Sequence, residues 1–293
     1  AVEKLEYLIL YKRKAVFLVT TLLVIVAGLG ISRMEATGNI TGDLPKDDQI
    51  TQDLKFIENN FGGSIPFDII IDTKEPGIFY KRFEEIEAVQ EHLEGYDVFS
   101  KSLSLADGIK LLNMAYSNGN PDKFEIPSVL KLDKINDYLQ NSGANTGSNS
   151  ALLDSTQNLT RITLSIKDTG SYEIQALVDT IYPQIYELIN PDQAFLNEKM
   201  ADLEKAKGED KSVIVDDIYT KVPGIKVKMT KMYGTFNDEE LKEVENEVGF
   251  NDSLQKLVDN HEWGVIITGT SVVASNGTQY LVTNLFISLG IAI

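Results

Sequence analysis

An apolar run near the N-terminus constrains this chain more than any other feature. Residues 15–31, AVFLVTTLLVIVAGLGI, include no charged side chain. A helix of that length reaches roughly 26 Å at about 1.5 Å per residue, close to the roughly 30 Å hydrocarbon core of a bilayer. Lys12, Arg13 and Lys14 come immediately before it. Because basic residues beside a span stay on the cytoplasmic side, the sequence predicts a transmembrane helix over residues 15–32 whose N-terminal end faces the cytoplasm.

The same run has an alternative interpretation as a cleaved signal peptide, since signal peptides share a basic start and an apolar centre. The following residues, 32–40, offer no clean small-x-small cleavage site, and Arg33 comes early. A retained anchor is therefore favoured. Residues 1–14 predict a helix that lies in the cytoplasmic membrane interface, with a simple extension of the span as the alternative.

A second apolar segment lies at the other end of the chain. Residues 279–293, QYLVTNLFISLGIAI, are uncharged to the last residue, and the chain begins at Ala1 rather than at a methionine. We therefore expect a piece of a longer membrane protein. In this interpretation residues 279–293 are the start of a second, truncated transmembrane helix, and residues 33–278 form a domain outside the cytoplasm.

The charge of the chain is concentrated between the two apolar segments. The formal net charge is −17; residues 1–14 contribute +2 and the apolar segments nothing, so residues 33–278 carry −19. Such an acidic domain repels nucleic acid and anionic lipid headgroups, so nucleic acid is not expected as a partner. The chain has no cysteine, which excludes disulfides and thiolate metal sites, and we expect neither a metal nor a cofactor.

The domain between the apolar segments predicts two units in which a helix joins two strands. Strands are indicated by apolar alternation, and helices by apolar residues three and four positions apart. The predicted segments are 66–73, 78–95 and 96–104 in the first unit, and 159–168, 171–189 and 263–273 in the second. Two units of this kind predict a ferredoxin-like α+β fold with helical insertions.

Other segments are assigned around these units. Asp47 or Asp48 predicts the cap of a helix that ends at Gly62-Gly63. Residues 104–140 predict two helical pieces, and residues 141–151 a loop rich in turn residues. The insertion 190–262 is charged and mostly helical in pattern. Its one strand-like piece is GIKVKMTKMY, residues 224–233. Pro183, inside the second helix of the two units, predicts a kink.

The string Asp168-Thr169-Gly170-Ser171 matches the active-site signature of aspartic proteases. That chemistry needs two carboxylates that share a proton, and the chain has no second Asp-Thr/Ser-Gly; Lys167 also stands where an apolar residue is required. The string instead predicts a turn, with Ser171 capping the following helix and Glu173 in its first turn. His92 and His261, the only histidines, lie in no catalytic motif, so we do not expect an enzyme.

Three stretches carry a resemblance to a known family. The first is Asp43, Pro45 and Asp48 followed by Asn60-Phe61-Gly62-Gly63, directly after the first span. The others are IKDTGSYEIQALVDTIY, and ITGTSVVASNGTQYLVTNLFISLGIAI with its Thr268-Gly269-Thr270. In this order and spacing they resemble the first span, first porter domain and second span of MMPL-like exporters of the RND superfamily. The insertion 190–262 is longer than the basic plan of that family.

The resemblance implies a fragment of an inner-membrane exporter that uses the proton-motive force to move lipids, drugs or other hydrophobic or amphiphilic molecules. The implied partners are the bilayer, the substrate, the rest of the same transporter chain and further copies of it, and the domain is periplasmic. The proton-relay carboxylates of such exporters lie on later spans, and the two apolar segments contain no ionisable residue. The fragment is therefore expected to handle substrate in efflux.

A rival interpretation is a two-span receptor with a periplasmic ligand-sensing domain. A membrane-anchored hydrolase and an assembly scaffold are further alternatives. For the exporter, we hypothesise a substrate cleft between the two strand–helix–strand units. Phe99, Tyr116 and Phe124 are its candidate lining residues, although core or loop packing explains such side chains more often.

Overall fold

The computed structural model describes most of the chain, and everything below concerns these residues. They are 12–31, 44–45, 47–76, 82–128, 130–135, 152–207, 209–235, 237–245 and 247–292. The predicted loop 141–151 and the interfacial helix before Lys12 lie outside them.

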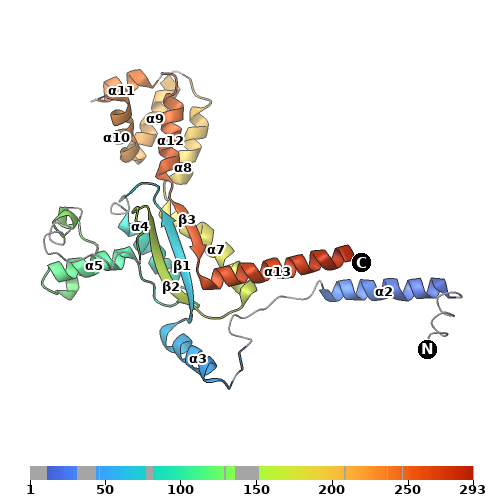
Figure 1. Cartoon of the computed structure of the whole chain (residues 1–293). Coiled ribbons are helices and arrows are strands. Elements are labelled where there is room, and N and C mark those ends of the chain that lie inside the picture. Colours follow the sequence, from blue (N-terminus) through green and yellow to red (C-terminus); the bar gives the residue numbers. More distant parts are fainter. Residues whose placement is uncertain are drawn as a thin grey trace.

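A small antiparallel sheet is the centre of the fold. Strands β1 (Ile65–Asp72), β2 (Leu159–Ile166) and β3 (Gly264–Thr268) form it in the order β2-β1-β3 (Figure 1). Side chains alternate across the sheet, so that Ile65, Phe67, Ile69 and Ile71 of β1 are all buried on one face. Helices and sheet together make the mixed α+β class that the sequence predicts.

The segment predicted as a strand over residues 96–104 lies along the free edge of β2. Ser100 N–H donates to the Ser165 carbonyl at 2.8 Å, and Leu103 and Thr163 exchange backbone hydrogen bonds at 2.8 and 2.9 Å. These contacts form only two isolated antiparallel bridges, not a continuous ladder. The prediction of a full strand is wrong because the Phe99 N–H bonds the Tyr96 carbonyl in a turn, and the Ser100 hydroxyl replaces a ladder acceptor for Ser165 N–H.

Two helices cover one face of the sheet and complete its core. Helix α4 (Phe83–Glu94) contributes Phe83, Ile86, Val89 and Leu93, as the helical spacing predicts. Helix α7 (Ser171–Ile189) runs through Pro183 and contributes a second apolar face. The buried members of this face are Ile174, Ile181, Ile185 and Ile189. Side chains of both helices and of the three strands form one continuous core.

The insertion forms a second lobe with a hydrophobic core of its own. Its helices are α8 (Gln193–Leu203), α9 (Glu209–Lys221), α10 (Pro223–Tyr233), α11 (Asp238–Val244) and α12 (Phe250–His261). We call this part the bundle lobe; Figure 1 shows it standing apart from the sheet. The strand-like interpretation of residues 224–233 is wrong, because Ile225 and Met229, one helical turn apart, are buried while Val227 is exposed.

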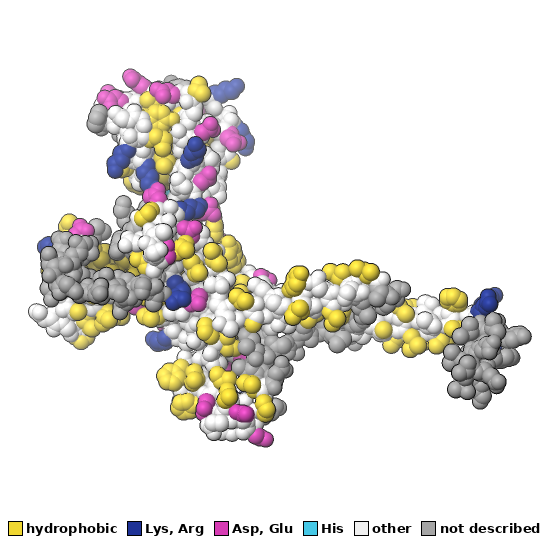
Figure 2. All heavy atoms as spheres, viewed as in Figure 1, with side chains coloured by type: hydrophobic (Ala, Val, Ile, Leu, Met, Phe, Trp, Pro, Cys, Tyr) yellow, Lys and Arg dark blue, Asp and Glu magenta, His cyan; other side chains and the backbone are white. Residues whose placement is uncertain are grey.

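Two further helices project from the sheet. Helix α3 (Gln49–Phe61) is capped by the Asp48 carboxylate, which accepts from Ile50 N–H, and it ends at Gly62 in the left-handed conformation, both as predicted. Four of its apolar residues, Ile50, Phe56, Ile57 and Phe61, are exposed, and Figure 2 shows hydrophobic side chains gathered over this helix. Helix α5 (Leu105–Tyr116) starts in a capping box of Ser104 and Asp107, and the short 3₁₀ helix η2 (Pro121–Lys123) follows it.

One helix is long and apolar enough to cross a membrane, among the described residues and by length and composition alone. It is α2 (Arg13–Ile31), whose window Arg13–Gly30 is the candidate span. Helix α13 (Thr270–Ala292) carries no charge but does not meet the same criterion over the described residues, so a second span stays a prediction. The strand predicted over residues 263–273 is wrong beyond Thr268, since α13 already begins at Thr270.

Candidate functional site: a joint and a neck at the two ends of β3

Strand β3 passes into helix α13 through one residue, Gly269. Its φ is +110°, a conformation that side-chain-bearing residues rarely adopt. A Cβ at this position would lie 2.6 Å from the Pro66 carbonyl oxygen and 2.9 Å from the Phe67 Cα. The strand-to-helix turn is therefore pressed against the start of β1, and only glycine fits there.

Two buried serines fix the first turns of α13 to the neighbouring elements. The Ser271 hydroxyl donates to the Pro66 carbonyl at 2.9 Å, and the Ser275 hydroxyl donates to the Ser171 carbonyl. Both serines are almost fully buried, and Val272 between them joins the sheet core. We call this group, with Gly269, the joint. It ties α13 to β1 and α7 without a flexible linker.

The protease-like string forms one side of the joint. Gly170 is the residue before helix α7, with φ +98° and no side-chain cap, so the prediction that Ser171 caps this helix is wrong. Ser171 instead occupies the first helical position and is buried. Glu173 lies in the first turn as predicted. The string thus makes a turn and a helix start that contacts α13.

The other end of β3 meets the bundle lobe at a connection that we call the neck, built around Asn190, Trp263 and Arg82. The Trp263 N–H donates to the Asn190 Oδ1 at 2.8 Å, and the Asn190 Nδ2 donates to the Trp263 carbonyl at 2.9 Å. Both residues are buried, and the Arg82 guanidinium lies 4.2 Å from the centre of the Trp263 ring. These contacts hold together the two chain segments that enter and leave the bundle lobe.

Polar side chains add further contacts across the neck. Lys74 Nζ donates to the Asp259 carbonyl at 2.7 Å, and Lys228 Nζ lies 2.6 Å from Glu75 Oε1. The Tyr186 hydroxyl donates to Glu262 at 2.8 Å. Burial, together with this carboxylate, raises the pKa of Tyr186 to about 12. The hydroxyl therefore keeps its proton and its hydrogen bond at every physiological pH.

The histidine at the neck is more easily deprotonated than usual. Burial lowers the pKa of His261, and the positive charge of Arg82 adds to this effect. The other histidine, His92, shares Gln184 Oε1 with the Tyr96 hydroxyl, each at 2.8 Å. His92 thus lies in a structural contact between α4 and α7. In the part of the chain that the structure describes, no group of three or more His, Asp or Glu side chains could hold a metal ion.

The three candidate cleft residues do not lie together. Phe99 is buried in the sheet core, with its ring centroid 4.9 Å from that of Phe67. Tyr116 is the exposed last residue of α5, which leads away from the sheet (Figure 1). Phe124 is also exposed, and Lys110 Nζ lies 5.8 Å from its ring centre. Only Tyr116 and Phe124 are accessible to a ligand, and their role as substrate contacts stays a prediction.

The bundle lobe contains a buried carboxylate outside the joint and the neck. Glu245 is 1% exposed; its Oε2 accepts from the Ser212 hydroxyl at 2.7 Å, and its Oε1 has no hydrogen-bond partner among the described residues. Burial raises the pKa of Glu245, and the charge of Asp216 raises it further. The carboxylate is therefore a destabilising element of this lobe when it is ionised.

Replacing this carboxylate by a neutral amide tests that conclusion. We expect Glu245→Gln to raise the free energy of unfolding by about 1–2 kcal/mol at pH 7–8, because it removes a buried charge. The pKa of Glu245 is higher in the folded than in the unfolded chain, so its penalty is present above the folded pKa and disappears below the unfolded value of about 4.3. The advantage of the variant should therefore shrink as the pH falls.

Urea unfolding between pH 4 and pH 8 measures this difference. Glu247→Gln is the matched control, because Glu247 is exposed two positions further along and should show little change. A variant no more stable than the parent at pH 8 would contradict the interpretation.

The joint and the neck lie at the two ends of one short strand. Strand β3 has only five residues, and both of its ends are fixed by buried hydrogen bonds, at the neck by Asn190 and at the joint by Ser271. Strand β3 is therefore a short connection, fixed at both ends, between the bundle lobe and α13. Sequence reasoning missed these residues, although the Thr268-Gly269-Thr270 string marked the position of the joint. Comparison of the chain with protein-family models, with curated proteins and with solved structures finds no match.

Proposed function

We propose that the chain is the substrate-handling porter domain of an MMPL-like RND exporter, with α2 as the first membrane helix and α13 as the start of the second. The observation that carries this proposal is the joint, since a domain built around β3 continues into α13 through Gly269 alone. Such a connection suits a protein in which movements of membrane helices and of an external domain must be coupled.

The topology of the sheet supports the proposal. With the edge segment 98–103 included, the order across the sheet is 98–103, β2, β1, β3, and all neighbours are antiparallel. Helix α4 follows β1, and helix α7 follows β2. This order is the one expected for a ferredoxin-like double βαβ unit; in the proposal, 98–103 stands for a degenerate second strand and the bundle lobe is an insertion before the fourth.

In this proposal the domain is periplasmic and the membrane is the bacterial inner membrane, with the N-terminus in the cytoplasm. The charge-free part of α2 from Ala15 to Ile31 and the basic residues Lys12, Arg13 and Lys14 before it support this orientation. The chain binds hydrophobic or amphiphilic substrate, with Tyr116 and Phe124 as the accessible aromatic candidates, and it carries out no chemical step. Proton relay belongs to other spans of the same exporter.

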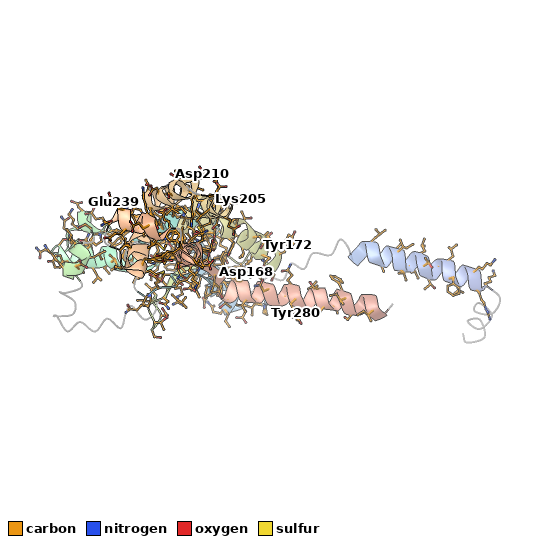
Figure 3. All side chains as sticks on the ribbon, turned by 90° about the horizontal axis from the view of Figure 1, so that it is seen from above. Asp168, Tyr172, Lys205, Asp210, Glu239 and Tyr280 are labelled. Atoms are coloured by element: carbon orange, nitrogen blue, oxygen red, sulfur yellow. The ribbon has the colours of Figure 1, made fainter. Side chains whose placement is uncertain are left out.

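The orientation can be tested with single cysteines, because the chain has none of its own. Lys205 lies at the surface of the bundle lobe (Figure 3), and Lys12 precedes α2. In spheroplasts, a membrane-impermeant maleimide should label the Lys205→Cys variant at once and the Lys12→Cys variant only after lysis. Labelling of both variants before lysis, or of neither, would contradict the proposed topology.

Transport is tested with the complete gene product that contains this chain. Cells that produce it should accumulate less of the hydrophobic dye Nile red than cells that lack it, and a protonophore should abolish the difference. If the topology is as proposed but dye and lipid probes accumulate equally with and without the protein, the exporter proposal fails and the two-span receptor takes its place.

A further inference from the structure

Two exposed tyrosines lie on α7 and α13, the two helices that meet at the joint. Tyr172 in the first turn of α7 is 63% exposed, and Tyr280 on α13 is 69% exposed. The preceding residue of Tyr172, Ser171, accepts a hydrogen bond from Ser275 of α13. Figure 3 shows Tyr172 and Tyr280 at a similar level along the axis of α13. One large exposed aromatic ring from α7 and one from α13 thus lie at the same level along the α13 axis.

The composition of α13 changes from polar to apolar at Tyr280. The five residues before Tyr280 are Ser275, Asn276, Gly277, Thr278 and Gln279, whereas apolar side chains predominate from Leu281 onward. Tyrosine concentrates where a membrane helix passes from water into hydrocarbon, because its ring is apolar and its hydroxyl needs a polar partner. Tyr280 therefore marks the boundary of the hydrocarbon core, if α13 enters a bilayer as proposed above.

The spacing places Tyr172 within the headgroup layer. Ser275 lies five residues before Tyr280, which corresponds to about 7.5 Å along a helix. The headgroup region on each side of the core is roughly 5–8 Å thick. Since Ser275 contacts the first turn of α7, that turn lies no further from the core than the thickness of one headgroup layer.

We infer that the first turn of α7 rests on the membrane surface, with Tyr172 and Tyr280 both immersed among lipid headgroups. The joint then lies directly above the bilayer, and the domain is held against the lipid by a pair of aromatic rings on two rigidly connected helices. The recognised partner is a lipid surface, contacted mainly through apolar and hydroxyl groups. The inference rests on the proposed insertion of α13, which the experiment below tests separately.

The depth of each position can be measured by tryptophan fluorescence. Trp263 is the only tryptophan, so Trp263→Phe gives a background into which one new tryptophan is placed at a time. The positions are Leu285→Trp in the apolar part of α13, Tyr280→Trp, Tyr172→Trp, and Tyr182→Trp as a matched control further along α7. The variants are reconstituted in phosphatidylcholine vesicles brominated either high or low on the acyl chain.

The expected result is a graded loss of emission. Bromines low on the chain should quench the Leu285→Trp variant most, and bromines high on the chain should quench the Tyr280→Trp and Tyr172→Trp variants most. The Tyr182→Trp variant should not be quenched. An unquenched Leu285→Trp variant would overturn the insertion of α13 and with it the proposed function.

A quenched Leu285→Trp variant with an unquenched Tyr172→Trp variant would overturn only the inference. Emission of the latter near that of tryptophan in water would mean a solvent-exposed turn, and blue-shifted emission without quenching would mean that another protein covers it. Cysteines with nitroxide labels at the same positions give a second readout that keeps Trp263, through the accessibility of each label to oxygen and to a water-soluble nickel complex.

Discussion

Gly269→Val is expected to lower the free energy of unfolding of the sheet domain by about 3 kcal/mol or more, since strain and overpacking each cost about 1–3 kcal/mol. A β-branched residue resists the φ of +110°, and its Cβ would meet the Pro66 carbonyl oxygen at 2.6 Å. The chain must move either α13 or the start of β1 to make room. If the proposed exporter function holds, this variant of the complete protein should lose transport even where it reaches the membrane in normal amounts.

The matched control is Gly277→Val, which lies on α13 about two helical turns after Gly269. A Cβ there meets nothing within 4 Å, and Gly277 lies in regular helix. Thermal unfolding followed by Trp263 fluorescence compares the two variants. If Gly269→Val unfolds at the temperature of the parent, the joint does not have the close contact described here.

Asn190→Ala is the second change with a large expected effect. It leaves the Trp263 N–H and carbonyl without their partner in a buried environment, and each such group costs about 1–3 kcal/mol. We expect the free energy of unfolding to fall by about 2–5 kcal/mol. The fluorescence emission of Trp263 should also shift to the red, because water reaches its ring. Fluorescence and urea unfolding measure both effects on one sample.

Asn60→Ala provides the comparison for this variant. Asn60 is exposed on α3, and its amide donates to the Phe56 carbonyl in the same helix. Alanine is a good helix former, so little stability should be lost. An unchanged emission maximum in Asn190→Ala would show that the bundle lobe is held by contacts other than this pair.

Much of the fold follows from local pattern in the sequence. Helices α3, α4 and α7 have apolar residues at helical spacing and recognisable ends, and β1 and β2 alternate cleanly, so their existence and type are confirmed. The α+β class follows from their order. The apolar face of α3 was also predicted, yet its exposure could not be, because exposure depends on what other elements cover.

The wrong secondary-structure predictions concern short segments whose residue pattern also fits a strand. In GIKVKMTKMY, lysines alternate with apolar residues and imitate a strand, but the neighbouring helices of the bundle lobe bury Ile225 and Met229 on one face. After Thr268, the β-branched Val272 and Val273 favour a strand locally. The close approach of Gly269 to β1 turns the chain instead, and tertiary contact overrides the local preference.

The joint and the neck could not be predicted from local sequence patterns, because their residues lie far apart in the chain. Asn190 and Trp263 pair across 73 positions of sequence, and Ser275 bonds a carbonyl 104 positions away. No periodicity or motif connects such residues. Phe99 was proposed as a substrate contact from its type alone, and the structure gives it a place in the core next to Phe67.

The two sides of the joint should tolerate amino-acid substitutions to different degrees, because α13 contributes side chains and its partners contribute main-chain carbonyls. Ser271 and Ser275 donate to main-chain carbonyls of Pro66 and Ser171, and any residue at those two positions still offers a carbonyl. Gly170 before α7 also favours glycine, because its φ is +98°, but the two hydroxyls and Gly269 lie on the side of α13. Variants that uncouple the sheet domain from α13 should therefore concentrate in one short stretch, residues 269–275.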